Sequence, residues 1–204
     1  MKRFFHIMAA TAGLALFGGA AAHAQVETYS FEQPHTQILF FADHLGFSQS
    51  TGRFHDFDGH FVLDRDNPEN SSVKIVIETA SIDMGLERWD DHMKNEDFFD
   101  VENYPTMTFE STGVTVTGEN TADVTGDLTI LGVTKPATLH VTHNKSGEHP
   151  FNGRYIAGFT AHAEIDRREW GMDYGYPVMG PMVEIRVTVE GIRDDEDDSA
   201  ADPT

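Results

Sequence analysis

Histidine and carboxylate side chains, the groups that bind metals and transfer protons, gather at three places in this sequence. The three sets are His55, Asp56, Asp58 and His60; Asp90, Asp91, His92 and Glu96; and His140 and His143. A catalytic zinc ion needs three such ligands in a tight set, with a fourth position left open for water or substrate. A metal-dependent or redox enzyme is therefore one hypothesis that these residues raise.

The spacing of the three sets argues against a metal site. His140 and His143 are three residues apart in a segment with strand character, so their side chains point to opposite faces. In the set that begins at His55, only alternate residues converge. The chain has no cysteine, and no serine stands in a strand–elbow–helix motif such as G-x-S-x-G. We therefore predict no catalytic residue, no metal and no cofactor, and keep the enzyme as the alternative.

The first 24 residues have the features of a secretory signal peptide. Lys2 and Arg3 precede an apolar stretch that ends near Ala22, and small residues around His23 suit cleavage before Gln25. A signal peptide of this kind predicts that the mature protein is periplasmic. Without cysteine the mature chain must be stable without disulfides.

The remaining residues form one domain followed by an acidic tail. The formal net charge is −20, and removal of the leader takes away two basic and no acidic residues. Such a charge argues against binding to nucleic acid or to anionic lipid head groups. Residues 194–204 have nothing apolar to bury and are expected to be disordered. The predicted domain is thus 25–193.

The body of the chain alternates between apolar and polar residues with period two. Eight or nine such runs occur, among them "QILFFADHLGF", "TGRFHDFDGHFVLD", "SVKIVIETA", "TMTFEST", "ADVTGDLTILG", "ATLHVTH", "AGFTAHAEIDR" and "VEIRVTVEGI". Short runs separated by turn-forming residues indicate an antiparallel all-β fold. With this many strands the options are a closed barrel or a two-layer sandwich, and a polar outside with an apolar inside favours the barrel.

Large and very small residues are interleaved on the face expected to point inward. The large ones are Phe40, Phe57, Phe61, Phe109, Leu128 and Phe159, and the small ones are Ala42, Gly59, Gly126, Ala161 and Ala163. An eight-stranded barrel is just wide enough to be filled by its own side chains or to hold one small ligand. The small residues favour a retained cavity. Two alternatives remain. The glycines could serve only to let the strands bend, or the chain could be a structural protein whose barrel is packed full by its own side chains.

One segment, 87–105, does not alternate and has helical character at its start. Trp89 and Met93 are four apart and make an apolar stripe, and Arg88 and His92 lie four apart beside it. A short amphipathic helix in an all-β chain should lay its apolar stripe over an open barrel end. We therefore predict a cap, with Phe98 and Phe99 plugging or lining the mouth. We expect Trp170 and Met172, just after a strand, to close the far rim.

Four segments in order resemble the YceI-like family of secreted bacterial proteins. They are "FFADHLGFSQSTGRFHDFDGHF", "ASIDMGLERWDDHMKNEDFFDVENYPTMTFEST", "VTGDLTILGVTKPATLHV" and "EIDRREWGM", and together they cover nearly the whole mature chain. The resemblance implies an extended, eight-stranded, lipocalin-like antiparallel barrel with one capping helix around a long apolar tunnel. It also implies a carrier of amphiphiles, especially polyisoprenoids with a polar or phosphorylated head, without an established enzymatic activity.

The resemblance transfers to particular residues. His44 matches the inward histidine that ends the first long strand, and His92 with Met93 matches the His-Leu pair of the capping helix. The family pattern there is Arg-Asp-x-His, whereas this chain has Trp89 in place of the arginine and Arg88 one position earlier. If the family arginine contacts an anionic head, Arg88 would have to do so from a helix face rotated by roughly 100°. A neutral lipid or a quinone-like head remains equally open.

We therefore expect a polyisoprenoid, isoprenoid quinone or fatty-acyl lipid to bind in the tunnel. The residues expected to bind it are Ile38, Phe40, Ala42, His44, Phe57, Phe61, Ile75, Ile77, Arg88, Trp89, His92, Met93, Phe98, Phe99, Phe109, Leu128, Phe159, Trp170 and Met172. His44 is expected inside the tunnel, either bonded to a head group or satisfied by a neighbouring strand. Release would need transient contact with a membrane or an acceptor protein. The sequence also leaves open a homodimer that uses the helix.

Overall fold

The computed structural model describes residues 26–194. The expected signal peptide, residues 1–24, and the expected acidic tail, apart from its first residue Asp194, lie outside the described residues. No helix within 26–194 has the length and apolar composition needed to cross a bilayer.

Strands make up most of the described chain, as the alternation predicts. They are β1 (Val26–Phe31), β2 (Gln37–His44), β3 (Ser48–Phe54), β4 (Phe57–Asp64), β5 (Ser72–Glu78), β6 (Ile82–Asp83), β7 (Thr106–Val116), β8 (Thr121–Ile130), β9 (Val133–Glu148), β10 (Tyr155–Asp166) and β11 (Met182–Arg193). The helical elements of this part are α1 (Glu87–Lys94) and the 3-10 turns η1 (Gln33–His35), η2 (Pro68–Asn70), η3 (Thr79–Ser81) and η4 (Arg167–Trp170). Strand β1 is not among the alternating runs that the sequence showed.

Eight of the strands close into an antiparallel barrel. The order around the ring is β1-β4-β5-β7-β8-β9-β10-β11, and β11 returns to β1 through pairs such as Tyr29 with Arg193. This confirms the predicted lipocalin-like barrel with one capping helix and excludes the two-layer sandwich. Closure gives every one of the eight strands two partners, so the ring leaves no exposed edge.

The barrel is elongated because three further strands, β2, β3 and β6, extend its wall beyond the eight-stranded ring. Strand β2 pairs with the first half of β11, β3 pairs with β2, and β6 pairs with β3. Each continues a ring strand after a short break: η1 separates β1 from β2, residues 55–56 separate β3 from β4, and η3 separates β5 from β6. The break at 55–56 matches the irregularity that the sequence indicated near His55.

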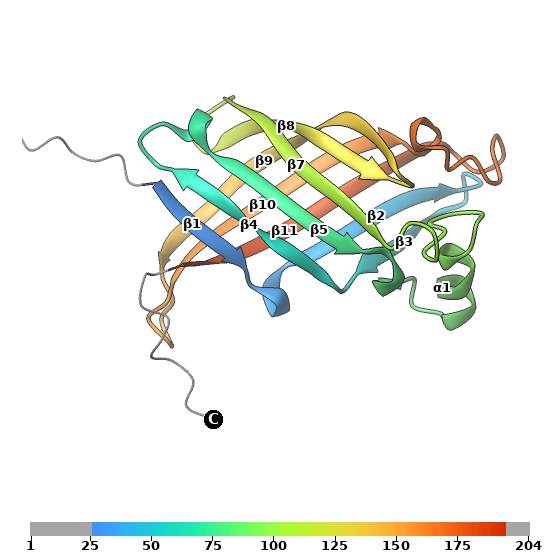
Figure 1. Ribbon diagram of the computed structural model, residues 1–204, viewed down its shortest axis with the longest axis horizontal. Helices are drawn as coiled ribbons and strands as arrows, with labels where there is room; N and C mark the ends of the chain where they lie inside the picture. Colours follow the sequence, from blue (N-terminus) through green and yellow to red (C-terminus); the bar gives the residue numbers. More distant parts are fainter. Residues whose placement is uncertain (1–25, 195–204) are drawn as a thin grey trace, which may run out of the picture.

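The two ends of the barrel carry different structures (Figure 1). One end, the cap end, holds α1, the β2–β3 turn and the connection from β10 to β11. The segment 84–105 that contains α1, here called the cap segment, joins β6 to β7. The opposite end holds η2 and the turns that join β7 to β8 and β9 to β10. Any ligand site inside the barrel therefore lies between two unlike mouths.

Aromatic rings occupy the space beside the inward glycines. A Cβ atom at Gly126 would lie 2.5 Å from the ring of Phe109, and one at Gly52 would overlap the ring of Phe40. Gly59 has a φ of +146°, and a Cβ there would overlap the carbonyl oxygen of Lys74. The expectation that Gly59 and Gly126 leave vacant space is therefore wrong, because a ring fills one place and backbone the other.

A buried polar cluster closes the wall near the opposite end. The Glu27 carboxylate accepts hydrogen bonds from Arg65 Nε (2.5 Å), Arg193 Nη1 (2.9 Å) and the Tyr29 hydroxyl (2.7 Å). Arg65 Nη2 also lies 2.8 Å from the Tyr29 hydroxyl oxygen, and both guanidinium groups stack on the ring of Tyr155. Glu27 is 6% exposed and Tyr29 is fully buried. Such a network is stable only because its partners are satisfied.

This cluster predicts a loss of stability at alkaline pH. Burial and the hydrogen bond to Glu27 raise the pKa of Tyr29 from 10.0 to about 12. A raised pKa adds stability that is complete below pH 10 and is lost as the pH rises towards 12, in total about 2–3 kcal/mol. Urea unfolding between pH 9 and 12 should therefore show the wild-type advantage over Tyr29→Phe shrinking by this amount. A difference that does not change with pH would contradict the prediction.

Candidate ligand-binding cavity

A continuous cavity of about 710 Å³ runs inside the barrel. Residues of the cap end, such as Trp89 and Tyr174, and residues of the opposite end, such as Pro68 and Asn120, line the same cavity. Between them its wall is made by inward apolar side chains of the strands. The volume lies in the range of roughly 300–1,000 Å³ that is usual for small-molecule sites. The barrel is therefore hollow rather than packed full.

Most of the side chains predicted to bind ligand line this cavity. They are Ile38, Phe40, Ala42, His44, Phe61, Ile75, Ile77, Trp89, His92, Met93, Phe98, Phe99, Phe109, Leu128, Phe159, Trp170 and Met172. The strand members share the face that alternation assigned to the inside. Their contact with a ligand stays a prediction.

Two predicted residues, Phe57 and Arg88, do not line the cavity. Phe57 begins β4 directly after the strand break, and its buried ring packs edge-on against Phe31 at 6.3 Å, inside the wall. Arg88 is exposed. Helix α1 turns Trp89 and Met93 towards the cavity, and a neighbouring position in an α-helix points about 100° away. Arg88 therefore lies outside the cavity wall to which Trp89 and Met93 belong.

His44 lies at the rim rather than inside the tunnel. It is exposed and still belongs to the cavity wall. Strand β2 ends at His44, and the following turn is closed by a hydrogen bond from Phe47 N to His44 O (3.0 Å). An inward side chain at the last residue of a strand reaches only the open end of the barrel, which is why the expectation of an enclosed imidazole is wrong.

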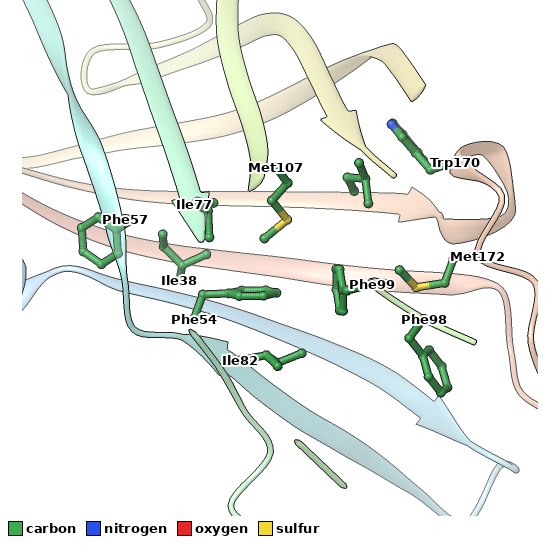
Figure 2. Close-up of a cluster of buried hydrophobic side chains, with 11 residues drawn as sticks. Ile38, Phe54, Phe57, Ile77, Ile82, Phe98, Phe99, Met107, Trp170 and Met172 are labelled. Carbon is green, nitrogen blue, oxygen red and sulfur yellow. The ribbon is translucent and has the colours of Figure 1, made fainter. Parts of the chain in front are cut away.

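The cap segment narrows the cavity at its end of the barrel. Asp90 in α1 accepts a hydrogen bond from Met84 N (2.6 Å), which holds the helix start. His92 bonds to Asp97 (3.0 Å) and packs edge-on against the ring of Phe98 at 5.0 Å. Figure 2 shows Phe98 and Phe99 among the buried side chains of this region. The segment thus places two rings in the mouth, as its sequence indicated.

Trp170 and Met172 lie at the cap end, not at the far rim. Trp170 Nε1 donates to Leu128 O near the end of β8 (3.0 Å), and Met172 belongs to the same buried cluster as Phe98 and Phe99 (Figure 2). The physical reason is the direction of the strands. Strand β10 runs antiparallel to β11, whose first residues pair with the cap end of β2. The connection from β10 to β11 must therefore lie beside the cap.

The sequence prediction missed six charged or titratable side chains of the wall, which are Asp43, Arg65, Glu119, His143, Arg167 and Tyr174. The alternation of "ATLHVTH" does put His143 on the inward face with Leu139 and Val141. Its ring lies 5.1 Å from that of Phe159, and burial together with the nearby charge of Arg65 lowers the pKa of His143. For Arg167, "EIDRREWGM" contains two adjacent arginines and no local pattern that tells which is buried.

The histidine–carboxylate sets do not converge on one point. His140 pairs with Asp123 (2.7 Å) on the outer face, and His55 pairs with Asp83 (2.9 Å), which also binds Arg53. Among residues 26–194, no group of three His, Cys, Asp or Glu side chains is arranged to hold a metal ion. The chemistry that this geometry offers is enclosure of an apolar molecule.

Comparison with known proteins agrees with this architecture. The model of the YceI-like domain matches residues 29–191. UPF0312 proteins of Azotobacter vinelandii and Pseudomonas aeruginosa are 38% and 40% identical over 181 residues, which is 89% of this chain and 94% of each relative. Two solved structures share the fold. Burkholderia cenocepacia BcnA has a TM-score of 0.72 at 23% identity, over 78% of this chain and 98% of its own. A polyisoprenoid binding domain from Saccharophagus degradans has 0.59 at 15%, over 81% and 98%.

Proposed function

The chain belongs to the YceI-like family, and from that premise we propose that it is a non-catalytic carrier that holds a long-chain amphiphile in the barrel. The observation that carries the proposal is the continuous apolar cavity, whose wall is made by inward side chains of the closed ring. The name of the Saccharophagus degradans domain supports a polyisoprenoid as the ligand. An isoprenoid quinone or a fatty-acyl chain has the same elongated apolar shape.

The mechanism is sequestration from water. Each methylene group that leaves water for the cavity contributes about 0.8 kcal/mol. Ten such groups, after the cost of ordering the chain, still oppose dissociation by several kcal/mol. Spontaneous release is therefore slow, and transfer requires a surface that accepts the chain directly. The expected signal peptide supports the periplasm as the compartment of this exchange.

The test is to identify what co-purifies with the protein. The protein, exported with its own leader, is extracted with organic solvent and the extract is analysed by mass spectrometry; uptake of an added C20 prenol is measured in parallel. We expect a long-chain lipid in near-stoichiometric amount. Absence of lipid together with no uptake of the prenol contradicts the proposal. Stoichiometric zinc, copper or iron would instead favour the alternative of an enzyme.

Exposed apolar side chains around the cap end support transient contact with a membrane. They are Leu45, Phe47, Leu86, Trp89, Tyr174, Tyr176, Val178 and Met182, here called the rim. Phe47 is 88% and Val178 is 69% exposed. Rings and aliphatic groups of this kind suit the membrane–water interface. The net charge of −20 favours a zwitterionic rather than an anionic surface.

Substitutions in the rim are predicted to change the rate of lipid transfer from a membrane without changing the equilibrium affinity for the lipid. Phe47→Ser combined with Val178→Ser should slow transfer of a prenol from phosphatidylcholine vesicles at least about 100-fold, because burial of these side chains stabilises the encounter by roughly 1.5–3 kcal/mol each. Equilibrium binding should stay the same. Phe151→Ser is the matched control, since Phe151 is 91% exposed at the opposite end. Equal slowing by this control would contradict the assignment of the cap end.

A further inference from the structure

Arg167 is a buried cation in the wall of the cavity. It begins η4 at the cap end and is only 6% exposed. The neighbouring residues in this wall include Trp170 and Met172 from the same connection. An arginine stays charged in proteins, so the fold keeps a positive charge beside an apolar space. Burial lowers the pKa of Arg167, which expresses the cost of keeping that charge away from water.

The hydrogen bonds of Arg167 leave part of its guanidinium unused. Its Nη1 donates to Met172 O (2.7 Å), its Nε to Gly180 O (3.3 Å) and its Nη2 to Met179 O (3.5 Å). A guanidinium has five N–H groups, so two remain without a partner among the described residues. Each terminal nitrogen holds one of them. Each terminal nitrogen can therefore still donate one hydrogen bond to a carboxylate or phosphate oxygen.

No carboxylate within residues 26–194 forms an ion pair with Arg167. Asp166, which is bound by Arg168 (2.5 Å), and Asp173, which is exposed to water, attract the guanidinium through space without contacting it. The other arginine in the cavity wall, Arg65, has the carboxylate of Glu27. A buried charge is normally paired, because desolvation is costly without a counter-charge. The three carbonyl oxygens offer hydrogen bonds but only partial negative charge.

On the basis of the proposed carrier function, we propose that Arg167 binds the head group of the ligand and selects an anionic head, a phosphate or a carboxylate. The head lies at the cap end and the chain extends along the cavity towards the opposite end. Exposed carboxylates at this mouth are screened by water and salt, whereas the guanidinium is not. The selection therefore acts through direct contact and not through the field of the whole chain, which is negative.

The experiment compares three ligands with one chain and different heads. Geranylgeraniol, geranylgeranoic acid and geranylgeranyl monophosphate compete with a neutral fluorescent lipid for the purified, delipidated protein. We expect at least one anionic ligand to bind tenfold or more tightly than the alcohol, since two charge-assisted hydrogen bonds distinguish them. The monophosphate and the acid separate a phosphate head from a carboxylate head. Equal binding of all three ligands overturns the inference.

Two variants test whether Arg167 causes the preference for an anionic head group. Arg167→Met should bring the ratio between anionic ligand and alcohol to within about twofold while the alcohol still binds. Arg88→Met is the control, because Arg88 is exposed on α1 and outside the cavity wall; its ratio should equal that of the wild type. A ratio that survives in Arg167→Met, or is lost in Arg88→Met, overturns the assignment. If the wild-type protein binds none of the three ligands, including the alcohol, the carrier function itself is contradicted.

A second measurement avoids the risk that Arg167→Met does not fold, since its bonds to three carbonyls also hold the β10–β11 connection. In wild-type protein with labelled arginine, the Nε–Hε NMR signal of Arg167 is followed during titration. The anionic ligand should shift it strongly and the alcohol weakly. Arg167→Lys assigns the signal and keeps the charge without the two-pronged geometry. Identical shifts with both ligands overturn the inference.

Discussion

Replacing Ala161 by tryptophan is expected to abolish lipid binding. Ala161 lies on the inward face of β10 between Val141 of β9 and Val187 of β11, and it lines the cavity. An indole there occupies space that four or five methylene groups of a ligand would use, which removes roughly 3–4 kcal/mol of burial. The affinity for a C20 prenol should fall at least about 100-fold. Because the space is empty, the cost in stability should be small compared with overpacking a dense core.

The adjacent residue provides a matched control. His162 follows Ala161 in β10 and points outward, where it is exposed. His162→Trp adds an indole to the same strand without entering the cavity, so prenol binding should be unchanged. Affinity is measured by displacement of a fluorescent lipid, and folding by circular dichroism. If Ala161→Trp folds and still binds normally, the ligand does not use this cavity.

Replacing Glu27 by glutamine is expected to destabilise the barrel strongly. Glu27 compensates two arginines, Arg65 and Arg193, inside the wall. The substitution removes a buried carboxylate charge that two partly buried guanidinium groups contact, which costs about 3–5 kcal/mol. For a domain of this size the melting temperature should fall by roughly 10 °C. Thermal unfolding of both proteins at neutral pH measures the effect.

Asp83 is the less buried counterpart of Glu27. It also contacts two potential cations, Arg53 and His55, but its side chain is 28% exposed and theirs about half. Pairs at such sites contribute about 0–1 kcal/mol, so Asp83→Asn should shift the melting temperature far less than Glu27→Gln. Equal shifts would mean that burial of the Glu27 cluster has no special energetic role.

The dependence of stability on pH below 4.5 provides an independent test of the role of Glu27. Burial alone would raise the pKa of Glu27, but hydrogen bonds from Arg65, Tyr29 and Arg193 hold it below the ordinary value of 4.5. A lowered pKa adds stability that is present above pH 4.5 and is lost as the pH falls below it. The advantage of the wild type over Glu27→Gln should therefore shrink in acid.

The strands and the closed architecture could be predicted from local patterns. Alternation along β2, β10 and β11 identifies the inward face because successive side chains of a strand point to opposite sides. The cap could be predicted from the stretch around Trp89 and Met93, which does not alternate. These two residues are four apart, and this spacing places them on one face of a helix. Strand β1 was not predicted because its inward positions include Glu27. A charged residue at an inward position breaks the apolar alternation, and its buried partners cannot be identified from the sequence.

The details of how the interior is filled could not be predicted in this way. Glycine at position 126 suggested vacant space, yet the ring of Phe109 from the neighbouring strand takes it. Which end of the barrel receives Trp170 depends on the direction of β10 relative to β11. Whether Arg167 or Arg168 is buried depends on the carbonyls of residues 172–180, which only the folded connection brings to the guanidinium.

By itself, the order of apolar and polar residues determined that this chain forms antiparallel strands with one apolar face and a helical cap, and it favoured a closed barrel over a sandwich. The tertiary structure decided that the retained cavity connects residues of both barrel ends, and where charges enter its wall. The reason is physical: alternation is a property of neighbours along one strand, whereas free volume and charge pairing are properties of side chains that meet across eight strands after the ring has closed.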